Sequence, residues 1–251
     1  MTSSLNRISF TGADDLVNAS SLAAISAVYP DVEWALLYFD EKDNKPRVPS
    51  KTWREQFVQK YPTVPKALHL CGNQVFHNIL QGIILPEFKG YARIQLNINT
   101  RAADFSDDEL TRIYSTLLNA GHTLILQYHT YTQNAIHALL ATAKPDLPVH
   151  VLFDASQGRG VLPTSWPQVI TGVYCGFAGG LNPQNVATTL NALDSANRAP
   201  YWVDMETGVR TNNLFDLEKI ISILRLIYGP AIGKFFNYLI KTNPELTLGG
   251  V

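Results

Sequence analysis

The chain has 251 residues, with 20 Lys and Arg against 21 Asp and Glu, and a formal net charge of −1. That balance argues against a nucleic-acid-binding arm or a basic membrane-binding face. Apolar residues make up 46% of the chain, enough for a large core without disulfides. The two cysteines are 104 positions apart and the N-terminus has no apolar signal core, so we expect a cytoplasmic protein with free thiols.

Short apolar runs alternate along the chain with longer helical patterns. The expected strands cover residues 7–12, 32–40, 66–72, 91–99, 122–130, 148–156, 171–180 and 201–209. The expected helices cover 15–29, 52–61, 73–84, 106–121, 132–144, 182–196 and 216–228, with a long loop after the sixth strand. This pattern predicts an α/β fold, a (β/α)8 TIM barrel, because open doubly wound sheets usually have five or six strands.

We expect a single domain, with the barrel over about residues 7–230 and a C-terminal extension at 231–251. The extension exceeds what a barrel needs, and we interpret it as a capping helix or a contact with another copy of the chain. The apolar stretch 220–240 is interrupted by charged residues, Gly and Pro, which predicts an amphipathic helix and no membrane span.

Local signals define some helix ends. Asp14 or Asp15 is placed to cap the first helix. Ser106 and Glu109 form a capping-box pattern before the fourth helix, and Gly121 is suited to follow its last turn.

Alternation along the strands predicts an unusually polar barrel interior, because every second side chain of a strand points inward. The inward set comprises Arg93, Gln95, Asn97, Asn99, His69, Cys71, Gln127, His129, His150, Leu152, Asp154, Trp202, Asp204 and Glu206. Buried polar groups need partners, so this lining predicts either an internal hydrogen-bond network or a polar ligand. For the whole set we favour a ligand site.

Two glycine-containing turns follow the last two barrel strands. Gly179 and Gly180 let backbone N–H groups approach an anion, and the helix expected from Pro183 directs its positive end there. Thr207 and Gly208 can supply a second set of N–H groups. Loops after strands seven and eight form the usual phosphate cradle of this fold, so we predict a phosphate site rather than two tight turns.

The segments FDAS (153–156), QGRGVLPTSW (157–166), FAGGLNPQNV (177–186) and YWVDMETGVRT (201–211) carry a family resemblance. Their order and spacing resemble phosphoribosylanthranilate isomerase, a TIM barrel of tryptophan biosynthesis. The resemblance implies that Asp154 is the general acid in an Amadori rearrangement of a ribosylamine to a ketose amine. It further implies that Asp204 binds ribose hydroxyls and that Arg47 binds the anthranilate carboxylate.

The chain departs from the family at the general base. The resemblance places Ser9 where the family has a catalytic cysteine at the end of strand one, and a serine hydroxyl titrates too high to act alone. Glu206 replaces the first serine of the family's SSG segment. Because strand eight neighbours strand one in a closed barrel, we expect Glu206 beside Ser9, as the base or as the group that activates it. Arg159, in the loop after strand six, is a further candidate for binding a substrate anion.

Three functions remain open. The first is an isomerase acting on a phosphorylated ribosylamine, with no cofactor and a small phosphorylated substrate as its partner. The second is a metal-dependent sugar-phosphate epimerase with ligands drawn from His69, His129, Asp154, Asp204 and Glu206, although core histidines are the better interpretation. The third is a non-catalytic barrel that binds a sugar phosphate.

Overall fold

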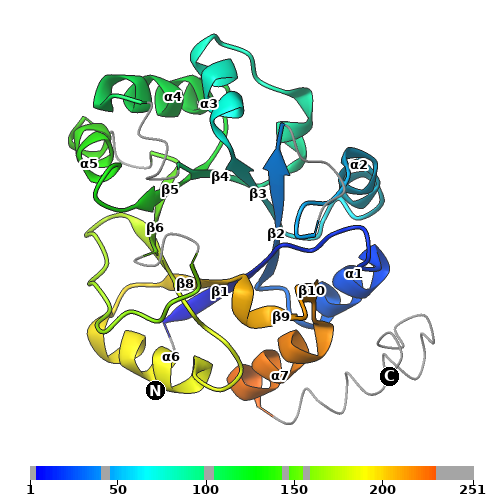
Figure 1. The fold of residues 1–251 in the computed structure, drawn as a ribbon. Helices are drawn as coiled ribbons and strands as arrows, with labels where there is room; N and C mark the ends of the chain where they lie inside the picture. Colours follow the sequence, from blue (N-terminus) through cyan, green and yellow to red (C-terminus); the bar gives the residue numbers. More distant parts are fainter. Residues whose placement is uncertain (1–3, 41–45, 99–104, 143–146, 155–158, 230–251) are drawn as a thin grey trace.

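The computed structural model describes residues 4–40, 46–98, 105–142, 147–154 and 159–229. Eight parallel strands close into a barrel in the order β1 to β8, and the helices surround it (Figure 1). The strands are β1 (Leu5–Thr11), β2 (Val32–Phe39), β3 (Lys66–Cys71), β4 (Arg93–Asn97), β5 (Leu124–Tyr128), β6 (Val149–Asp154), β7 (Tyr174–Ala178) and β8 (Tyr201–Met205). The predicted TIM barrel is confirmed.

The helices alternate with the strands as the sequence predicted. They are α1 (Ala19–Val28), α2 (Lys51–Lys60), α3 (Asn73–Leu80), α4 (Asp107–Asn119), α5 (Gln133–Ala141), α6 (Val186–Ala196) and α7 (Leu217–Tyr228). Short 3-10 turns occur at η1 (Pro86–Gly90) and η2 (Thr207–Val209), and a small hairpin joins β9 (Arg210–Thr211) to β10 (Leu214–Phe215). The described residues between β6 and β7 form no helix, in agreement with the expected loop.

The caps confirm one local prediction and correct another. Ser106 and Glu109 form the capping box of α4, and Gly121 follows that helix with a φ of 85°. The expected cap of α1 by Asp14 or Asp15 is wrong, because α1 begins after Asn18, whose side chain accepts from Ser20 N. Both aspartates instead bind other loops at the mouth of the barrel, as described below.

The predicted extension at 231–251 lies outside the described residues. The described barrel runs from Leu5 at the start of β1 to Tyr228 at the end of α7. Within the described residues, no helix combines the length and the apolar character needed to span a bilayer.

The interior of the barrel is layered. Its apolar part contains Ile125, Leu152, Ala178 and Trp202, contributed by four strands. A Cβ at Gly176 would lie 2.1 Å from the indole of Trp202, so β7 needs glycine opposite this side chain. The inward positions of Leu152 on β6 and Trp202 on β8, predicted from strand alternation, are therefore confirmed. Asn99, which belongs to the same prediction, lies outside the described residues.

A buried ion pair lies beside this apolar layer. Arg93 donates to Glu33 through Nε at 3.0 Å, and both side chains are almost fully buried. The Arg93 guanidinium also stacks on Trp202, 4.5 Å from the ring centroid. Burial alone would raise the pKa of Glu33, but the guanidinium of Arg93 overrides it and lowers that pKa to about 2. The pair therefore keeps a carboxylate ionised inside the barrel.

We predict that Glu33→Gln lowers the free energy of unfolding by about 3–5 kcal/mol at neutral pH, because it leaves Arg93 buried without its counter-charge. The wild-type contribution should be complete above the ordinary carboxyl value of 4.5 and lost as the pH falls toward 2. Denaturant unfolding as a function of pH measures both effects. Glu55→Gln is the control, because the Lys51–Glu55 pair is exposed and worth less than about 1 kcal/mol. Equal losses in the two variants would contradict the prediction.

Candidate active site

A small cavity lies at the carboxyl ends of β6, β7 and β8. Its lining comprises Asp154, Gly160, Ala178, Gly179, Gly180, Leu181, Asp204, Met205, Glu206, Thr207 and Gly208. Most of the candidate residues thus meet in one place, at the end of the barrel where TIM-barrel enzymes have their active sites.

Two buried carboxylates belong to this cavity. Asp154, the last residue of β6, accepts a hydrogen bond from Gln127 Nε2 at 2.9 Å. Asp204, on β8, accepts one from Thr11 Oγ1 at 2.6 Å. Burial raises the pKa of Asp204 to about 7, the Thr11 hydroxyl opposes that shift, and the nearby carboxylates of Glu206 and Asp154 add to it. Asp204 can therefore exchange a proton near neutral pH.

Thr11 and Gln127 contact the two carboxylates, but the sequence analysis gave neither of them a role in the site. Thr11 is the last residue of β1, and its side chain faces Asp204. The alternation that puts Ser9 inside the barrel puts Thr11 there as well, one step closer to the mouth. Gln127 was expected inside, but its contact with Asp154 depends on the pairing of β5 with β6 and could not be read from either strand alone.

The expected contact between Ser9 and Glu206 is not formed. Ser9 is paired in register with Asp204, and its hydroxyl donates to Glu33 Oε1 at 2.8 Å. Arg93 Nη2 approaches the same hydroxyl at 3.4 Å. Ser9 thus belongs to the buried ion-pair layer, whereas Glu206 follows the end of β8. The resemblance placed Ser9 at the end of strand one, but the residue at the end of β1 is Thr11.

The glycines of the expected cradle are in close backbone contact with neighbouring loops. A Cβ on Gly180 would lie 2.6 Å from Leu162 N, and one on Gly208 would lie 1.8 Å from Leu181 O. Gly179 and Gly180 have φ values of 126° and 64°, which favour glycine. The loop before β7 therefore packs directly on this turn, and side chains on these residues would separate the two.

Asparagine side chains hold the same turn. Asn182 Nδ2 and Asn185 Nδ2 both donate to Gly180 O, at 3.1 and 2.9 Å. The helix after the turn was expected from Pro183, but α6 begins at Val186 because this asparagine-bonded turn precedes it. The cradle thus consists of fixed backbone, with the helix starting further from it than predicted.

Arg47 lies at the centre of a network that joins three loops at the mouth. Its Nη1 donates to Glu206 Oε1 at 2.8 Å and its Nε donates to Asn213 Oδ1 at 2.8 Å. Its backbone N–H donates to Asp14 Oδ2, and Arg210 binds the same carboxylate. The network thus joins described residues that follow β1, β2 and β8, with Arg47 and Glu206 as the central pair.

Asp15, the other expected cap residue, joins the loops after β1 and β2. It accepts from both the backbone N–H and the hydroxyl of Ser50, each at 2.6 Å. Arg159 lies just before Gly160 of the cavity lining and is exposed. Its predicted role in binding an anion stays a prediction.

The opposite side of the mouth carries amides, a thiol and histidines. Gln95 Nε2 donates to Asn97 Oδ1 and Asn97 Nδ2 donates to Cys71 Sγ, while Gln95 Oε1 is buried without a partner. Burial lowers the pKa of His69 to about 3 and also lowers that of His129, whose Nε2 contacts Ile98 O. Both rings are thus neutral core groups near neutral pH.

The ligand set of a metal-dependent epimerase does not converge in the described part of the chain. No group of three or more His, Cys, Asp or Glu side chains there has the arrangement of a metal site. His129 uses both ring nitrogens, because Nδ1 also accepts from Tyr131 N. The geometry therefore does not support the metal-dependent alternative.

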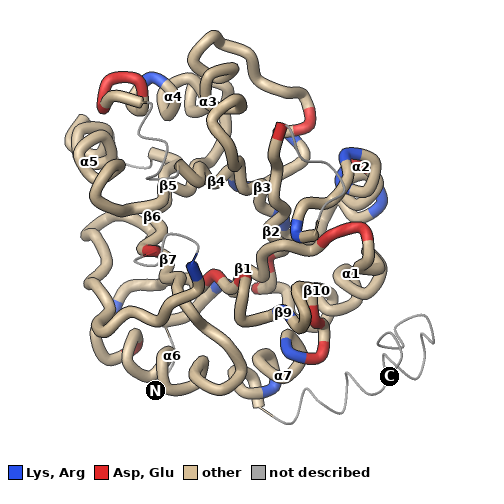
Figure 2. Tube along the Cα trace, viewed as in Figure 1, with Lys and Arg blue, Asp and Glu red and all other residues tan. Residues whose placement is uncertain are grey.

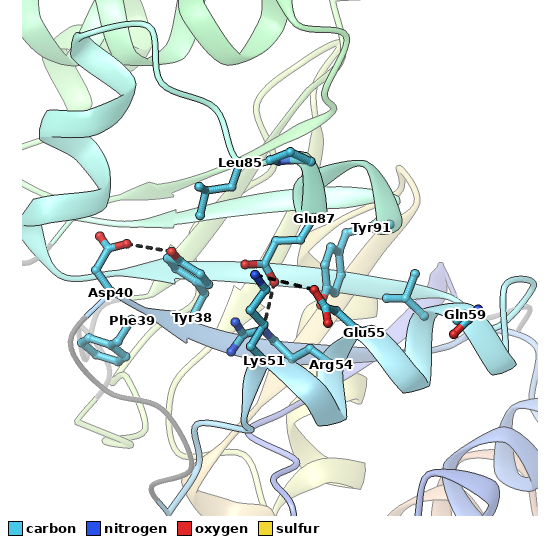
Figure 3. Close-up of a pocket in the computed structure, with 13 residues that line it drawn as sticks. Tyr38, Phe39, Asp40, Lys51, Arg54, Glu55, Gln59, Leu85, Glu87 and Tyr91 are labelled. Atoms are coloured by element: carbon cyan, nitrogen blue, oxygen red, sulfur yellow. Dashed lines mark hydrogen bonds and ion pairs between the residues drawn. The ribbon is translucent and has the colours of Figure 1, made fainter.

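A larger groove of about 850 Å³ lies on the flank of the barrel, between α2 and η1 (Figure 3). Arg54 crosses it to Glu87 at 3.2 Å, stacks over Tyr38 and donates to Pro49 O. Four of its charged residues form the pairs Arg54–Glu87 and Lys51–Glu55, and Asp40 accepts from the Tyr38 hydroxyl. None of the predicted site residues lines it. We therefore assign the candidate active site to the small cavity at the mouth.

Positions of Lys and Arg and positions of Asp and Glu both occur around the described parts of the trace (Figure 2). That distribution agrees with the near-neutral net charge.

Comparisons with known proteins match part of the sequence and most of the structure. The family model described as N-(5'phosphoribosyl)anthranilate (PRA) isomerase matches residues 107–225. The N-(5'-phosphoribosyl)anthranilate isomerase of Endomicrobium trichonymphae is 41% identical over 51 residues, which are 20% of this chain and 23% of that protein. The chain therefore matches less than a quarter of the length of this curated relative.

Solved structures agree over most of the chain. A monomeric form of the dimeric phosphoribosylanthranilate isomerase from Thermotoga maritima superposes with a TM-score of 0.54 at 16% identity, covering 89% of this chain and 98% of that one. The isomerase from Pyrococcus furiosus gives 0.53 at 17% identity, covering 88% and 97%. Identities this low show the fold alone. Together with the family match over residues 107–225, they show a TIM barrel that is similar to phosphoribosylanthranilate isomerase.

Proposed function

We propose that this barrel isomerises a phosphorylated ribosylamine from the aldose to the ketose form. The observation that carries the proposal is the meeting of two buried carboxylates, Asp154 and Asp204, in a cavity bordered by glycine backbone. An aldose–ketose isomerisation needs one group that gives a proton and one that takes a proton. It needs no oxidant or reductant, because hydrogen only moves within the substrate.

In the proposed reaction Asp154 acts as the general acid. It protonates the ring oxygen of the ribosylamine, the C1–O bond breaks, and the nitrogen lone pair forms an iminium ion. A base then removes the proton from C2, and the electrons of that C–H bond form the enamine. Tautomerisation of the resulting enol gives the ketose amine. The hydrogen bond from Gln127 to Asp154 orients this carboxyl group for the first step.

We assign the base to Asp204. The Ser9 hydroxyl is bonded to Glu33, and the carboxylate of Glu206 is held by Arg47, so neither has the position that we expected for the base. Asp204 is the carboxylate bonded to the end of β1, where the resemblance places the family's base. Its pKa, raised to about 7 by burial, suits a group that must both accept and release a proton near neutrality.

The cradle remains our candidate for the phosphate. Gly179, Gly180, Thr207 and Gly208 line the same cavity as the two aspartates. Glu206 would repel a dianion if it were unpaired, but its carboxylate is neutralised by Arg47 at 2.8 Å. That ion pair supports phosphate binding beside an acidic residue.

We predict that Asp154→Asn and Asp204→Asn each lower kcat by about 10²- to 10⁴-fold, because each removes one proton-transfer group. The measurement is loss of phosphoribosylanthranilate fluorescence, together with release of the ketose product from other phosphoribosylamines. Asp216→Asn at the cap of α7 is the control and should retain activity. Ligand binding without turnover in the wild type would instead identify a non-catalytic sugar-phosphate-binding barrel.

We predict that kcat/KM falls as the pH drops below about 7, because Asp204 must be ionised to accept the proton. Thr11→Val removes a donor that favours the ionised form, so its acidic limb should move to higher pH by about one pH unit. Thr11→Ser keeps the hydroxyl and should leave the limb in place. A limb that stays unchanged in Thr11→Val would exclude Asp204 as the titrating base.

We predict that Gly180→Ala weakens binding of ribose 5-phosphate about tenfold, because a Cβ there meets Leu162 N at 2.6 Å and displaces the cradle. Gly82→Ala is the matched control, since Gly82 also has a positive φ but has no atom within 4 Å of the added Cβ. Calorimetric titration measures the affinities. Equal weakening in both variants would mean that the effect is backbone strain and not the cradle.

A further inference from the structure

The groove between α2 and η1 has a fixed floor. The side chain of Arg54 is 4% exposed and joins Glu87 at 3.2 Å. Arg54 also donates to Pro49 O at 2.8 Å, and its guanidinium lies 5.1 Å from the ring centroid of Tyr38. The volume of about 850 Å³ is in the range of sites that hold small organic molecules. The groove is therefore a preformed pocket on the flank of the barrel.

Apolar side chains form its walls. Val58 of α2 lines one side, and Leu85 and Pro86 line the other. A Cβ at Gly90 would lie 2.7 Å from Val58 Cγ1, so α2 and η1 approach each other closely at this end. Walls of this kind suit the aromatic or aliphatic body of a small ligand.

One polar group of the groove has no partner. Tyr91 follows η1, lines the groove and is 7% exposed, and its hydroxyl makes no hydrogen bond. Burial raises the pKa of Tyr91, Arg54 lowers it, and Glu87 and Glu55 raise it further, so charged groups are near the hydroxyl although none bonds to it. A buried hydroxyl without a partner destabilises a fold, and such groups are rare in native proteins. A ligand in the groove would supply the missing partner.

The charges of the groove leave one carboxylate over. Two ion pairs join Lys51 to Glu55 at 3.8 Å and Arg54 to Glu87 at 3.2 Å. Asp40 follows β2, is exposed, and accepts a hydrogen bond at 2.7 Å from a neutral tyrosine hydroxyl. It forms no ion pair with a residue in the part of the chain that the structure describes. A ligand cation is therefore favoured over an anion at this end of the groove.

The two unfilled groups lie apart along the groove. Figure 3 shows Asp40 at one end, Tyr91 further along, and Leu85 between them in this view. The side chains of Lys51 and Glu55 are 62% and 56% exposed, so they can turn outward at little cost and let a ligand approach the Tyr91 hydroxyl. A ligand that reaches both groups is elongated, with a cation at one end and a polar atom at the other.

We propose that this groove is a second binding site, for an aromatic amine that also carries a hydroxyl group. The ammonium group pairs with Asp40, the ring packs against Leu85 and Val58, and the ligand hydroxyl bonds to the Tyr91 hydroxyl. The site lies outside the mouth of the barrel, so this proposal does not depend on the proposed function.

The experiment uses four probes of similar size. They are tyramine; phenethylamine, which lacks the phenol hydroxyl; tyrosol, an uncharged alcohol; and para-hydroxyphenylacetate, an anion. Titrations followed by NMR give their affinities for the full chain in the wild type, Asp40→Asn and Tyr91→Phe. Tyr61→Phe, outside the groove at the end of α2, and Asp108→Asn, exposed at the start of α4, are the matched controls.

The wild type should bind tyramine about tenfold more tightly than tyrosol, and para-hydroxyphenylacetate more weakly than either. Asp40→Asn should remove most of the difference between tyramine and tyrosol. Tyr91→Phe should weaken tyramine about fivefold and leave phenethylamine unchanged, because only tyramine has the hydroxyl that bonds to Tyr91. Both control variants should keep the wild-type affinities.

Stability gives an independent readout for Tyr91. Tyr91→Phe should unfold at the same or a higher denaturant concentration than the wild type, because it removes a buried hydroxyl that has no partner. Weaker binding together with unchanged or greater stability would assign the hydroxyl to the ligand and not to the fold.

Four results would overturn the proposal. They are the absence of tyramine binding, tighter binding of the anion than of the amine, an amine preference that Asp40→Asn leaves unchanged, and equal weakening of both amines by Tyr91→Phe. Loss of stability in Tyr91→Phe would show that the hydroxyl already has a partner in the chain, and would contradict the proposal as well.

Discussion

The ion pair between Glu33 and Arg93 determines how the inside of this barrel is used. It joins β2 to β4 across the interior, and Arg93 stacks on Trp202 of β8. A buried pair of this kind is stable only if its remaining polar groups also find partners. Ser9 supplies one of them by donating to Glu33. The deeper polar residues therefore bond to one another, and the residues nearer the mouth remain available for chemistry.

The site therefore consists of the layer above the ion pair. Thr11, Asp154 and Asp204 end or nearly end their strands, and glycine turns adjoin them on β7 and β8. The loop before β7 contributes to the same site because its backbone packs on Gly179 and Gly180. Close backbone packing here explains why residues 179, 180 and 208 must be glycine.

The sequence was sufficient for the barrel because the repeat of strands and helices, and the inward side of each strand, follow from local alternation. It was insufficient for Ser9, because the resemblance placed this residue at the end of strand one and no local pattern shows how deep in the barrel it lies. Only the register, which pairs Ser9 with both Glu33 and Asp204, shows that Ser9 lies deep and that Thr11 reaches the mouth. The prediction of the α1 cap was wrong for a related reason, because Asp14 and Asp15 bind residues that lie 33 to 196 positions away in the chain.

The pKa of Asp204 depends on its burial, on Thr11 and on the carboxylates of Glu206 and Asp154. In the proposed reaction, a bound phosphate dianion would add negative charge near a carboxyl group whose pKa is already about 7, and would raise that pKa further. Release of Glu206 from Arg47 would act in the same direction. Each increase would lower the fraction of Asp204 that is ionised and able to accept the proton from C2.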